Sequence, residues 1–236
     1  MGPVAGCTRW EGVGLSTRAD AAKPRAAPRL ASLLLVHGAG SGPWVFRGWA
    51  RTFPGIVVTF ADLQRGLDVT RASHGDYAEN VVRTAAELPQ PVSLCGWGMG
   101  GLVVLHASGR VRPHSAILLE ASPPAEVQGF NPTVRVCDGS FDPDAIYGRF
   151  PSDMQPRLES SRARAERKRG ISVPVLPCPS LVVCGDEFRE QRGRTIARFY
   201  GSQVLDFPGL GHWELVRAER VRTAIARWLG VIRTGE

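Results

Sequence analysis

The sequence predicts an α/β protein, with a mostly parallel sheet flanked by helices. Short apolar runs recur along the chain, and segments with apolar residues at helical spacing separate them. The runs are continuous rather than alternating, which is typical of strands buried on both faces. Glycine-rich motifs follow several of the runs, at the sheet edge where ligands of parallel sheets bind. Strands that alternate with helices indicate right-handed crossovers.

Six apolar runs are predicted as strands, and helical patterns lie between them. In chain order the strands are residues 30–36, 56–60, 92–95, 115–119, 180–184 and 203–207. A helix is predicted before the third strand, because Tyr77, Val81, Ala85 and Leu88 fall on one helical face. Residues 99–109 are predicted as the next helix. An amphipathic helix carrying Val221, Ile225, Trp228 and Leu229 is expected at the C-terminus.

The chain divides into an arm, a core and an insertion. Residues 1–29 are rich in Gly, Ala, Pro and Arg and predict a loose N-terminal arm, with a hint of an edge strand at 10–15. The α/β core is expected over 30–121 and 178–236. Residues 122–177 break the alternation, with several prolines, no good strand run and helical patches at 142–150 and 154–169. An insertion at this point predicts a lid, which usually selects the substrate and excludes water.

The composition excludes several classes of protein. The chain has 236 residues, of which 43% are apolar and 22% charged, as expected for one soluble globular domain. Its net charge of +7 comes mostly from arginine, which clusters at 157–169 and 217–233. Such charge runs are typical of solvated helix faces, although an anionic substrate or acidic partner would also suit them. No nucleic-acid-binding motif accompanies the charge, so no nucleic-acid partner is expected.

Location and metal content are predicted from what the sequence lacks. No apolar run approaches the ~18 residues of a membrane span, and the first residues show no leader peptide, so no membrane partner is expected. The chain has five cysteines, an odd number, so they do not indicate a disulfide framework. Their spacing does not match that of metal ligands either. We therefore expect a cytoplasmic protein without disulfides or a metal site. No cofactor motif is present, so none is expected.

The most informative motif is Cys-Gly-Trp-Gly-Met-Gly-Gly at 95–101. It matches the frame of the G-x-S-x-G nucleophile elbow, a serine on a sharp turn between a strand and a helix. Gly98 stands in the serine's position. The flanking glycines allow the turn, but the attacking hydroxyl is absent. Gly98 is therefore the position on which any functional interpretation depends.

Three further motifs follow other strands. His37-Gly38-Ala39-Gly40-Ser41-Gly42 can turn backbone N–H groups inward, so Ala39 and Met99 are the expected oxyanion-hole donors. Gly209-Leu210-Gly211-His212-Trp213 places a histidine at the same sheet edge. Gly185-Asp186-Glu187-Phe188 supplies a carboxylate to orient it. Asp186 is the expected partner of His212, with Glu187 and Glu120 as alternatives. The expected pocket lining is His37, Gly38, Trp44 and Trp97.

The order elbow, acid, histidine resembles the α/β-hydrolase superfamily from about Leu30 to Leu229. Within it the chain looks most like esterases, methylesterases, carbon–carbon bond hydrolases and hydroxynitrile lyases. It departs from the pattern at Gly98. It also departs at Phe188, where these families often carry the acid, three residues after the strand-ending glycine. The motif context assigns the base to His212. His74, His106 and His114 lack such context and are predicted as surface or helix residues.

Three functions are compatible with these residues. The first is an enzyme without a covalent step, in which a His–carboxylate base acts on water or on a small carbonyl substrate beside an oxyanion hole. Its reaction would be a hydrolysis, carbon–carbon cleavage, elimination or cyclisation. The second is a serine esterase inactivated by the glycine at position 98. The third is a ligand-binding member of the fold. The partner expected is a small-molecule substrate, with an acidic carrier protein as a possible donor.

Overall fold

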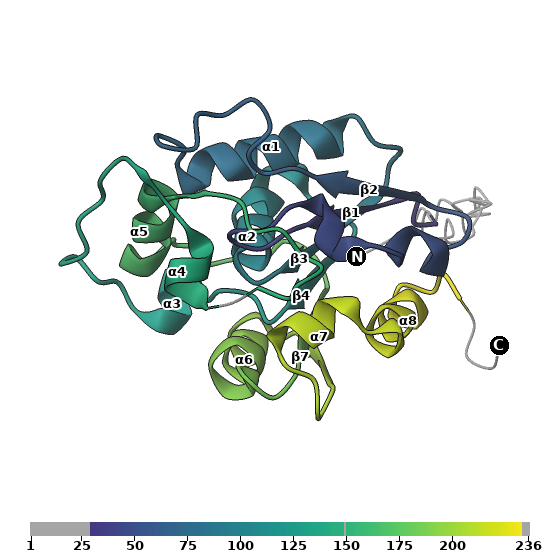
Figure 1. Ribbon diagram of the computed structural model, residues 1–236. Helices are drawn as coiled ribbons and strands as arrows, with labels where there is room; N and C mark the ends of the chain where they lie inside the picture. The colour runs from purple at the N-terminus through teal and green to yellow at the C-terminus, as the bar shows by residue number, and fades with distance from the viewer. Residues whose placement is uncertain (1–28, 149, 233–236) are drawn as a thin grey trace, which may run out of the picture.

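A computed structural model describes residues 29–148 and 150–232 (Figure 1). The predicted arm at 1–29 therefore lies outside the described residues except for its last residue. The main sheet has six strands in the order β2-β1-β3-β4-β7-β8, and every neighbouring pair is parallel. The predicted fold class is confirmed. The strands are β1 (Ser32–Val36), β2 (Val57–Ala61), β3 (Val92–Trp97), β4 (Ala116–Leu119), β7 (Ser180–Cys184) and β8 (Gln203–Asp206).

The central strands are buried on both faces, as their apolar runs predict. Every residue of β1, β3, β4 and β7 is buried. The edge strands β2 and β8 differ, because each has a neighbour on one side only and exposes part of its length. In β1, Leu34 packs into one core cluster and Leu33 and Leu35 into the other. Side chains that alternate between faces thus give the sheet an apolar core on each side.

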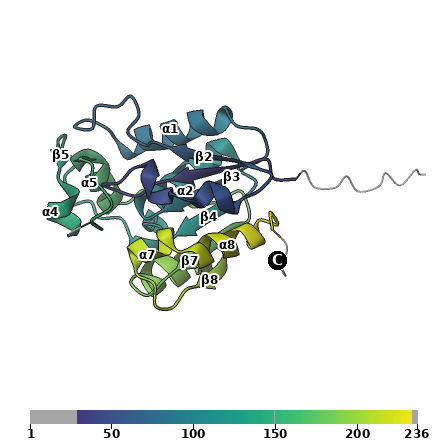
Figure 2. The same cartoon turned by 45° about the vertical axis from the view of Figure 1, so that its right-hand side comes forward.

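Helices cover both faces of this sheet (Figures 1 and 2). Residues of α1 (His74–Ala86), α2 (Met99–Val111) and α6 (Thr195–Tyr200) belong to the first core cluster. The second cluster takes residues from α7 (His212–Arg217), α8 (Glu219–Trp228) and the 3₁₀ turns η1 (Pro43–Phe46) and η2 (Trp49–Thr52). A π-helical segment, η3 (Arg189–Arg194), precedes α6. In the described part of the chain, none of the helices has the length and apolar character needed to cross a bilayer.

The insertion, residues 122–177, contains both helices and strands. Its elements are α3 (Ala125–Gln128), β5 (Ser140–Phe141), α4 (Pro143–Tyr147), β6 (Glu159–Ser160) and α5 (Ser161–Arg169). The expectation that it holds no strand is wrong, since β5 and β6 pair antiparallel over two residues each. These strands are too short to leave an apolar pattern in the sequence.

The helical patch expected at 154–169 begins seven residues later than predicted, since α5 starts at Ser161. Pro156 disfavours a helix around it, because proline lacks the amide hydrogen and clashes with the preceding turn. The side chain of Ser160 accepts a hydrogen bond from the backbone N–H of Ala163 at 3.1 Å and thereby caps α5. The earlier helical patch is shorter than expected as well, since Asp142 caps α4 and Gly148 ends it.

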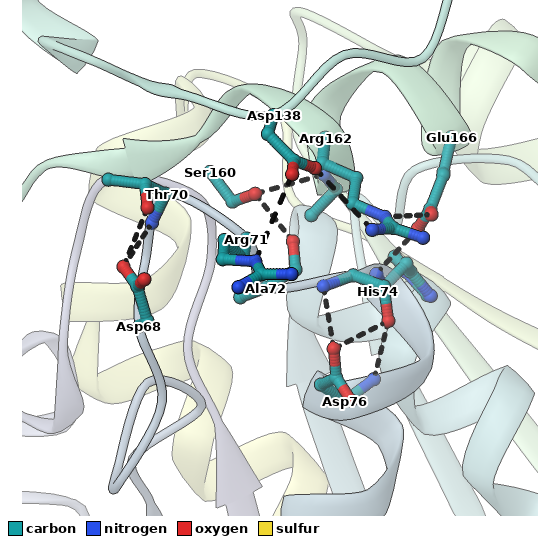
Figure 3. Close-up of polar contacts among 12 residues, drawn as sticks. Asp68, Thr70, Arg71, Ala72, His74, Asp76, Asp138, Ser160, Arg162 and Glu166 are labelled. Atoms are coloured by element: carbon teal, nitrogen blue, oxygen red, sulfur yellow. Dashed lines mark hydrogen bonds and ion pairs between the residues drawn. The ribbon is translucent and has the colours of Figure 1, made fainter.

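The insertion is fixed to the start of α1 by polar contacts (Figure 3). The hydroxyl of Ser160 donates to the carbonyl oxygen of Ala72 at 2.5 Å. The carboxylate of Glu166 accepts from the backbone N–H of His74 at 2.7 Å and from Arg162 at 3.2 Å. Glu166 thus supplies an acceptor for one of the free amides at the N-terminus of α1. Helix α5 therefore has a defined seat on the core.

His74 begins helix α1, which is one of the two locations expected for it, but the surface alternative is wrong because the residue is buried. It is 0% exposed, and its ring lies against that of His106, with 3.3 Å between the two Nδ1 atoms. Burial, followed by the charge of a protonated His106, lowers the pKa of His74 to about 3. Burial also lowers the pKa of His106. The fold therefore keeps both rings neutral at pH values where the unfolded chain would protonate them.

We predict that this pair makes the fold sensitive to acid. The pKa of His74 in the unfolded chain is near 6.5 and falls to about 3 on folding. Between these values the unfolded state binds the additional proton, so stability is complete above pH 6.5 and is lost as the pH falls toward 3. The loss is at most about 1.4 kcal/mol per pH unit for one group. In chemical denaturation from pH 7.5 to 4.5, His74→Gln should show a shallower decline than wild type. His114→Gln, at an exposed position, should retain the wild-type dependence of the unfolding free energy on pH. If His74→Gln also retained the wild-type dependence, the assignment would be contradicted.

Candidate functional site

A sharp turn at Gly98 joins β3 to α2. The backbone of Gly98 has φ 57° and ψ −120°. Its N–H donates to the carbonyl oxygen of Leu119 at 3.0 Å, and its carbonyl oxygen accepts from the N–H of Ser122 at 2.8 Å. These bonds hold the turn between β4 and the start of the insertion. A positive φ disfavours residues with a side chain, so glycine is the residue that occupies this conformation with least strain.

A second glycine allows the chain to approach this turn closely. A Cβ at Gly100 would lie 2.3 Å from the carbonyl oxygens of both Val36 and His37. Only glycine fits that space without moving backbone. The first turn of α2 therefore lies directly against the end of β1. This contact brings Met99 and Ala39 to the same pocket.

His212 faces the turn from the first position of α7, directly after the loop that follows β8. A Cβ built on Gly98 would lie 3.1 Å from Nε2 of His212. On the other side of the ring, Nδ1 lies 2.7 Å from Oε2 of Glu120. A carboxylate accepts hydrogen bonds, so the shared proton belongs to Nδ1 and leaves the lone pair of Nε2 directed at Gly98. The arrangement is chemically suited to accept a proton from a group beside Gly98.

Glu120 is the carboxylate that His212 binds. It ends β4, is 0% exposed and has a positive φ of 39°. Its second oxygen, Oε1, accepts from the N–H of Gly185 at 2.8 Å. Both carboxylate oxygens thus have partners, as a buried anion requires. In the sequence, this residue is marked by its position directly after a fully apolar strand. A carboxylate buried there needs hydrogen-bond donors to compensate for the loss of water.

The prediction of Asp186 as the partner of His212 is wrong. The Asp186 carboxylate is exposed and accepts from Arg189 at 2.6 Å and from the N–H of Gly209 at 2.7 Å. It closes the loop that carries His212 but does not contact the imidazole. The alternative Glu187 binds the backbone of His212, with Oε1 accepting from its N–H at 3.0 Å.

Aromatic rings fix the imidazole plane. Trp97 stacks on His212 with 4.6 Å between ring centroids and an interplanar angle of 26°. The indole N–H of Trp97 also donates to the carbonyl oxygen of His212 at 3.0 Å. Phe188 meets the imidazole edge-on at 5.4 Å. The histidine is thus oriented by a carboxylate, a stacked indole and an edge contact.

The glycine-rich loop, residues 37–42, is held by the insertion. Oε2 of Glu159 accepts from the N–H of Gly40 at 2.9 Å, and the N–H of Arg157 donates to the carbonyl oxygen of Gly40 at 2.8 Å. Oε1 of Glu159 accepts from the hydroxyl of Tyr77 at 2.5 Å. Glu159 is 1% exposed. No sequence pattern distinguishes this glutamate from the surface charges around it, so sequence reasoning missed it.

A pocket of about 360 Å³ opens beside Gly98 and His212. Gly38, Ala39, Trp97 and Met99 line it, as expected from the sequence. The other lining residues are Tyr147, Phe150, Arg167, Glu187, Phe188, Arg192 and Trp213. Two segments of the insertion thus close one side of the pocket. The described residues contain no group of three or more His, Cys, Asp or Glu side chains that could hold a metal ion.

Two residues expected in this pocket lie elsewhere. His37 is beneath the glycine-rich loop, where its Nε2 accepts from the N–H of Leu63 at 3.1 Å and its Nδ1 lies 2.9 Å from the carbonyl oxygen of Gly38. These backbone contacts occupy both ring nitrogens. Trp44 belongs to η1 and packs under the guanidinium of Arg157, with 5.6 Å from the guanidinium carbon to the ring centroid. It lines surface hollows away from Gly98.

The chain belongs to the alpha/beta hydrolase family, whose model matches residues 33–224. Solved structures share the fold. A methylesterase from Arabidopsis superposes with a TM-score of 0.63 at 18% identity, over 86% of this chain and 100% of that one. A metagenome-derived lipolytic enzyme gives 0.61 at 16%, over 86% and 94%. The RedJ thioesterase of prodiginine biosynthesis in Streptomyces coelicolor gives 0.57 at 16%, over 90% and 97%. No curated protein matches the chain.

We predict that Glu120, and not Asp186, sets the tautomer of His212. In Glu120→Gln the amide oxygen is needed by the N–H of Gly185, so the amide NH₂ faces His212 and requires an acceptor there. The proton of neutral His212 should then move from Nδ1 to Nε2. Imidazole ¹⁵N shifts at a pH where the ring is neutral measure this directly. Asp186→Asn should leave the proton on Nδ1; a tautomer change in that variant instead would contradict the pairing.

Proposed function

We propose that this protein is an enzyme that hydrolyses a small ester or related carbonyl compound without a covalent serine intermediate. The observation that supports this most strongly is the oriented pair of Glu120 and His212, whose free Nε2 faces a glycine. Esterase, lipolytic and thioesterase relatives of the same fold favour acyl chemistry. In this proposal Gly98 stands at the nucleophile position and leaves room for water.

The proposed base acts through a water molecule in that room. A serine side chain at position 98 would fill the space next to Nε2, because its Cβ alone would come within 3.1 Å. With glycine there, a water bound to Nε2 can lie beside a substrate carbonyl. His212 takes a proton from this water as its oxygen bonds to the carbonyl carbon. When the tetrahedral intermediate collapses, the same proton passes from Nε2 to the departing alkoxide.

The charge that forms on the carbonyl oxygen needs hydrogen-bond donors. We assign this role to the backbone N–H groups of Ala39 and Met99, which line the pocket on either side of Gly98. Donors fixed in place before the reaction stabilise such a charge without reorganising. Gly40 donates to Glu159 and accepts from the N–H of Arg157, and these bonds support the loop that carries Ala39. The insertion acts as the lid and limits the access of bulk water.

A serine esterase that lost its nucleophile is the second candidate. The close packing of Gly100 against the end of β1 favours it, because the frame around position 98 is complete without the serine. In that case the protein binds carbonyl compounds and does not turn them over. A ligand-binding member of the fold would behave in the same way. Turnover by the wild-type chain distinguishes the first proposal from both.

We predict that Gly98→Ser creates a nucleophile that Gly98→Ala does not. The serine variant should hydrolyse p-nitrophenyl acetate faster than wild type and should react covalently with a fluorophosphonate probe, detected as a mass increase. The alanine variant is the matched control, since it adds the same Cβ without the hydroxyl. Both variants should lose about 1–3 kcal/mol of stability, because a side chain is strained at φ 57° and ψ −120°. A folded Gly98→Ser protein with no gain over Gly98→Ala would refute the assignment of position 98.

We predict that His212→Ala lowers turnover by roughly 10²–10⁴-fold, the range expected for a positioned general base. A panel of acyl esters assayed with wild type first identifies a substrate. Its affinity should change much less, because the aromatic pocket provides most of the contact. His114→Ala, at an exposed position away from the pocket, is the control. Full turnover in His212→Ala would show that His212 is not the base. If wild type turned over none of the esters, the inactivated serine esterase would be favoured.

A further inference from the structure

We propose that the pocket selects substrates that carry an anionic group, a carboxylate or similar oxyanion, bound by Arg167 and Arg192. The inference deepens the proposed function by naming the substrate class, and it rests on that function. Arg167 comes from α5 of the insertion and Arg192 from η3 of the core. Both line the pocket that holds Gly98 and His212.

Arg192 is a cation largely removed from water. Its guanidinium lies 3.7 Å from the centroid of the Phe188 ring. Burial, followed by the nearby charge of Arg167, lowers the pKa of Arg192. Among the described residues, no carboxylate forms an ion pair with this guanidinium. A desolvated cation of this kind is costly unless an anion approaches it.

Two acids contribute charge at Arg192, and each binds another donor. Glu120 divides its two oxygens between Gly185 and His212. Glu187 accepts from the backbone N–H of His212. Neither forms a hydrogen bond with Arg192, although both contribute a favourable charge at longer range. Arg192 is therefore balanced only at longer range, and its guanidinium keeps donors that no carboxylate of the described residues binds.

Arg167 is held in place by neutral groups. Its guanidinium donates to the hydroxyl of Ser122 at 3.1 Å and to that of Tyr147 at 2.8 Å. Its Nε is buried and has no hydrogen-bond partner in the described structure. These contacts position the side chain without neutralising it. The two arginines thus present two like charges to one cavity.

A carboxylate or other oxyanion on the substrate would offset both charges. The planar fork of arginine matches an oxyanion in bidentate geometry, which gives strong and directional hydrogen bonds. The rings of Phe150, Phe188 and Trp213 supply apolar contact for the carbon skeleton between the anion and the carbonyl. The substrate class that fits is a small carbonyl compound with an anionic group at its far end.

Binding of non-hydrolysable ketones tests this without requiring turnover. By calorimetry, wild type should bind 5-oxohexanoate at least tenfold more tightly than the neutral 2,6-heptanedione of similar shape. A third probe, (4-oxopentyl)phosphonate, tests which anion the substrate carries. If the phosphonate binds more tightly than 5-oxohexanoate, the substrate carries a phosphate group. If it binds more weakly, the substrate carries a carboxylate. The proposal is overturned if both anions bind no more tightly than the diketone. It is also overturned if neither anion binds at concentrations up to about 10 mM, which detect even weak complexes.

Variants assign the effect to the two arginines. Arg192→Gln and Arg167→Gln should each weaken 5-oxohexanoate binding by roughly 10- to 100-fold and leave diketone binding nearly unchanged. Arg164→Gln is the matched control, because it removes the same charge from α5 at a side chain that stacks on Phe141 outside the pocket. An equal loss in Arg164→Gln overturns the assignment. His212→Ala should keep the preference for anions, so failure of the proposed base leaves this result interpretable.

Discussion

The carboxylate of Glu120 joins the ends of three neighbouring strands. It leaves β4, accepts a hydrogen bond from Gly185 after β7 and binds His212 after β8. Because the strands are parallel and adjacent, their carboxyl ends meet at one edge, and a single buried side chain can reach all three. An unpaired anion at this depth would cost several kcal/mol, so the two loops are constrained to supply their donors. The position of the imidazole follows from the sheet order through this one residue.

The turn at Gly98 and the neighbouring Glu120 differ in backbone strain. A side chain at a positive φ costs stability, and functional sites in proteins often bear such a cost. Glycine has a positive φ at this position without that cost, whereas Glu120, directly after β4, has a positive φ with a side chain. The backbone strain is therefore borne by the residue that orients the histidine rather than by a nucleophile. That distribution suits a site in which the precise position of a base is the more important requirement.

Sequence reasoning predicted the sheet well, because buried parallel strands leave continuous apolar runs and glycine-rich turns mark their ends. It placed His212, Gly98, Ala39 and Met99 at one edge for the same reason, and the structure brings them to one pocket. It chose the wrong acid. Asp186 was preferred as the acid nearest the usual position, which is occupied by Phe188, whereas Glu120 is specified by a three-dimensional contact with Gly185. His74 and Glu159 were also hidden, since burial of a polar side chain depends on partners distant in sequence. The two-residue strands between β4 and β7 carry no periodic signal.

Glu159 constrains which parts of the insertion can change during evolution. Its carboxylate connects the insertion to Gly40 on the loop after β1 and to Tyr77 on α1. Exchange of the whole insertion for that of a relative would remove this acid and leave two buried donors without an acceptor, a cost of about 1–3 kcal/mol for each. Many of the described residues between Gly129 and Arg157 are exposed, although Met154 packs into the second core cluster. Diversification of substrate preference is therefore expected to concentrate in that stretch, while residues 159–166 behave as part of the inherited core.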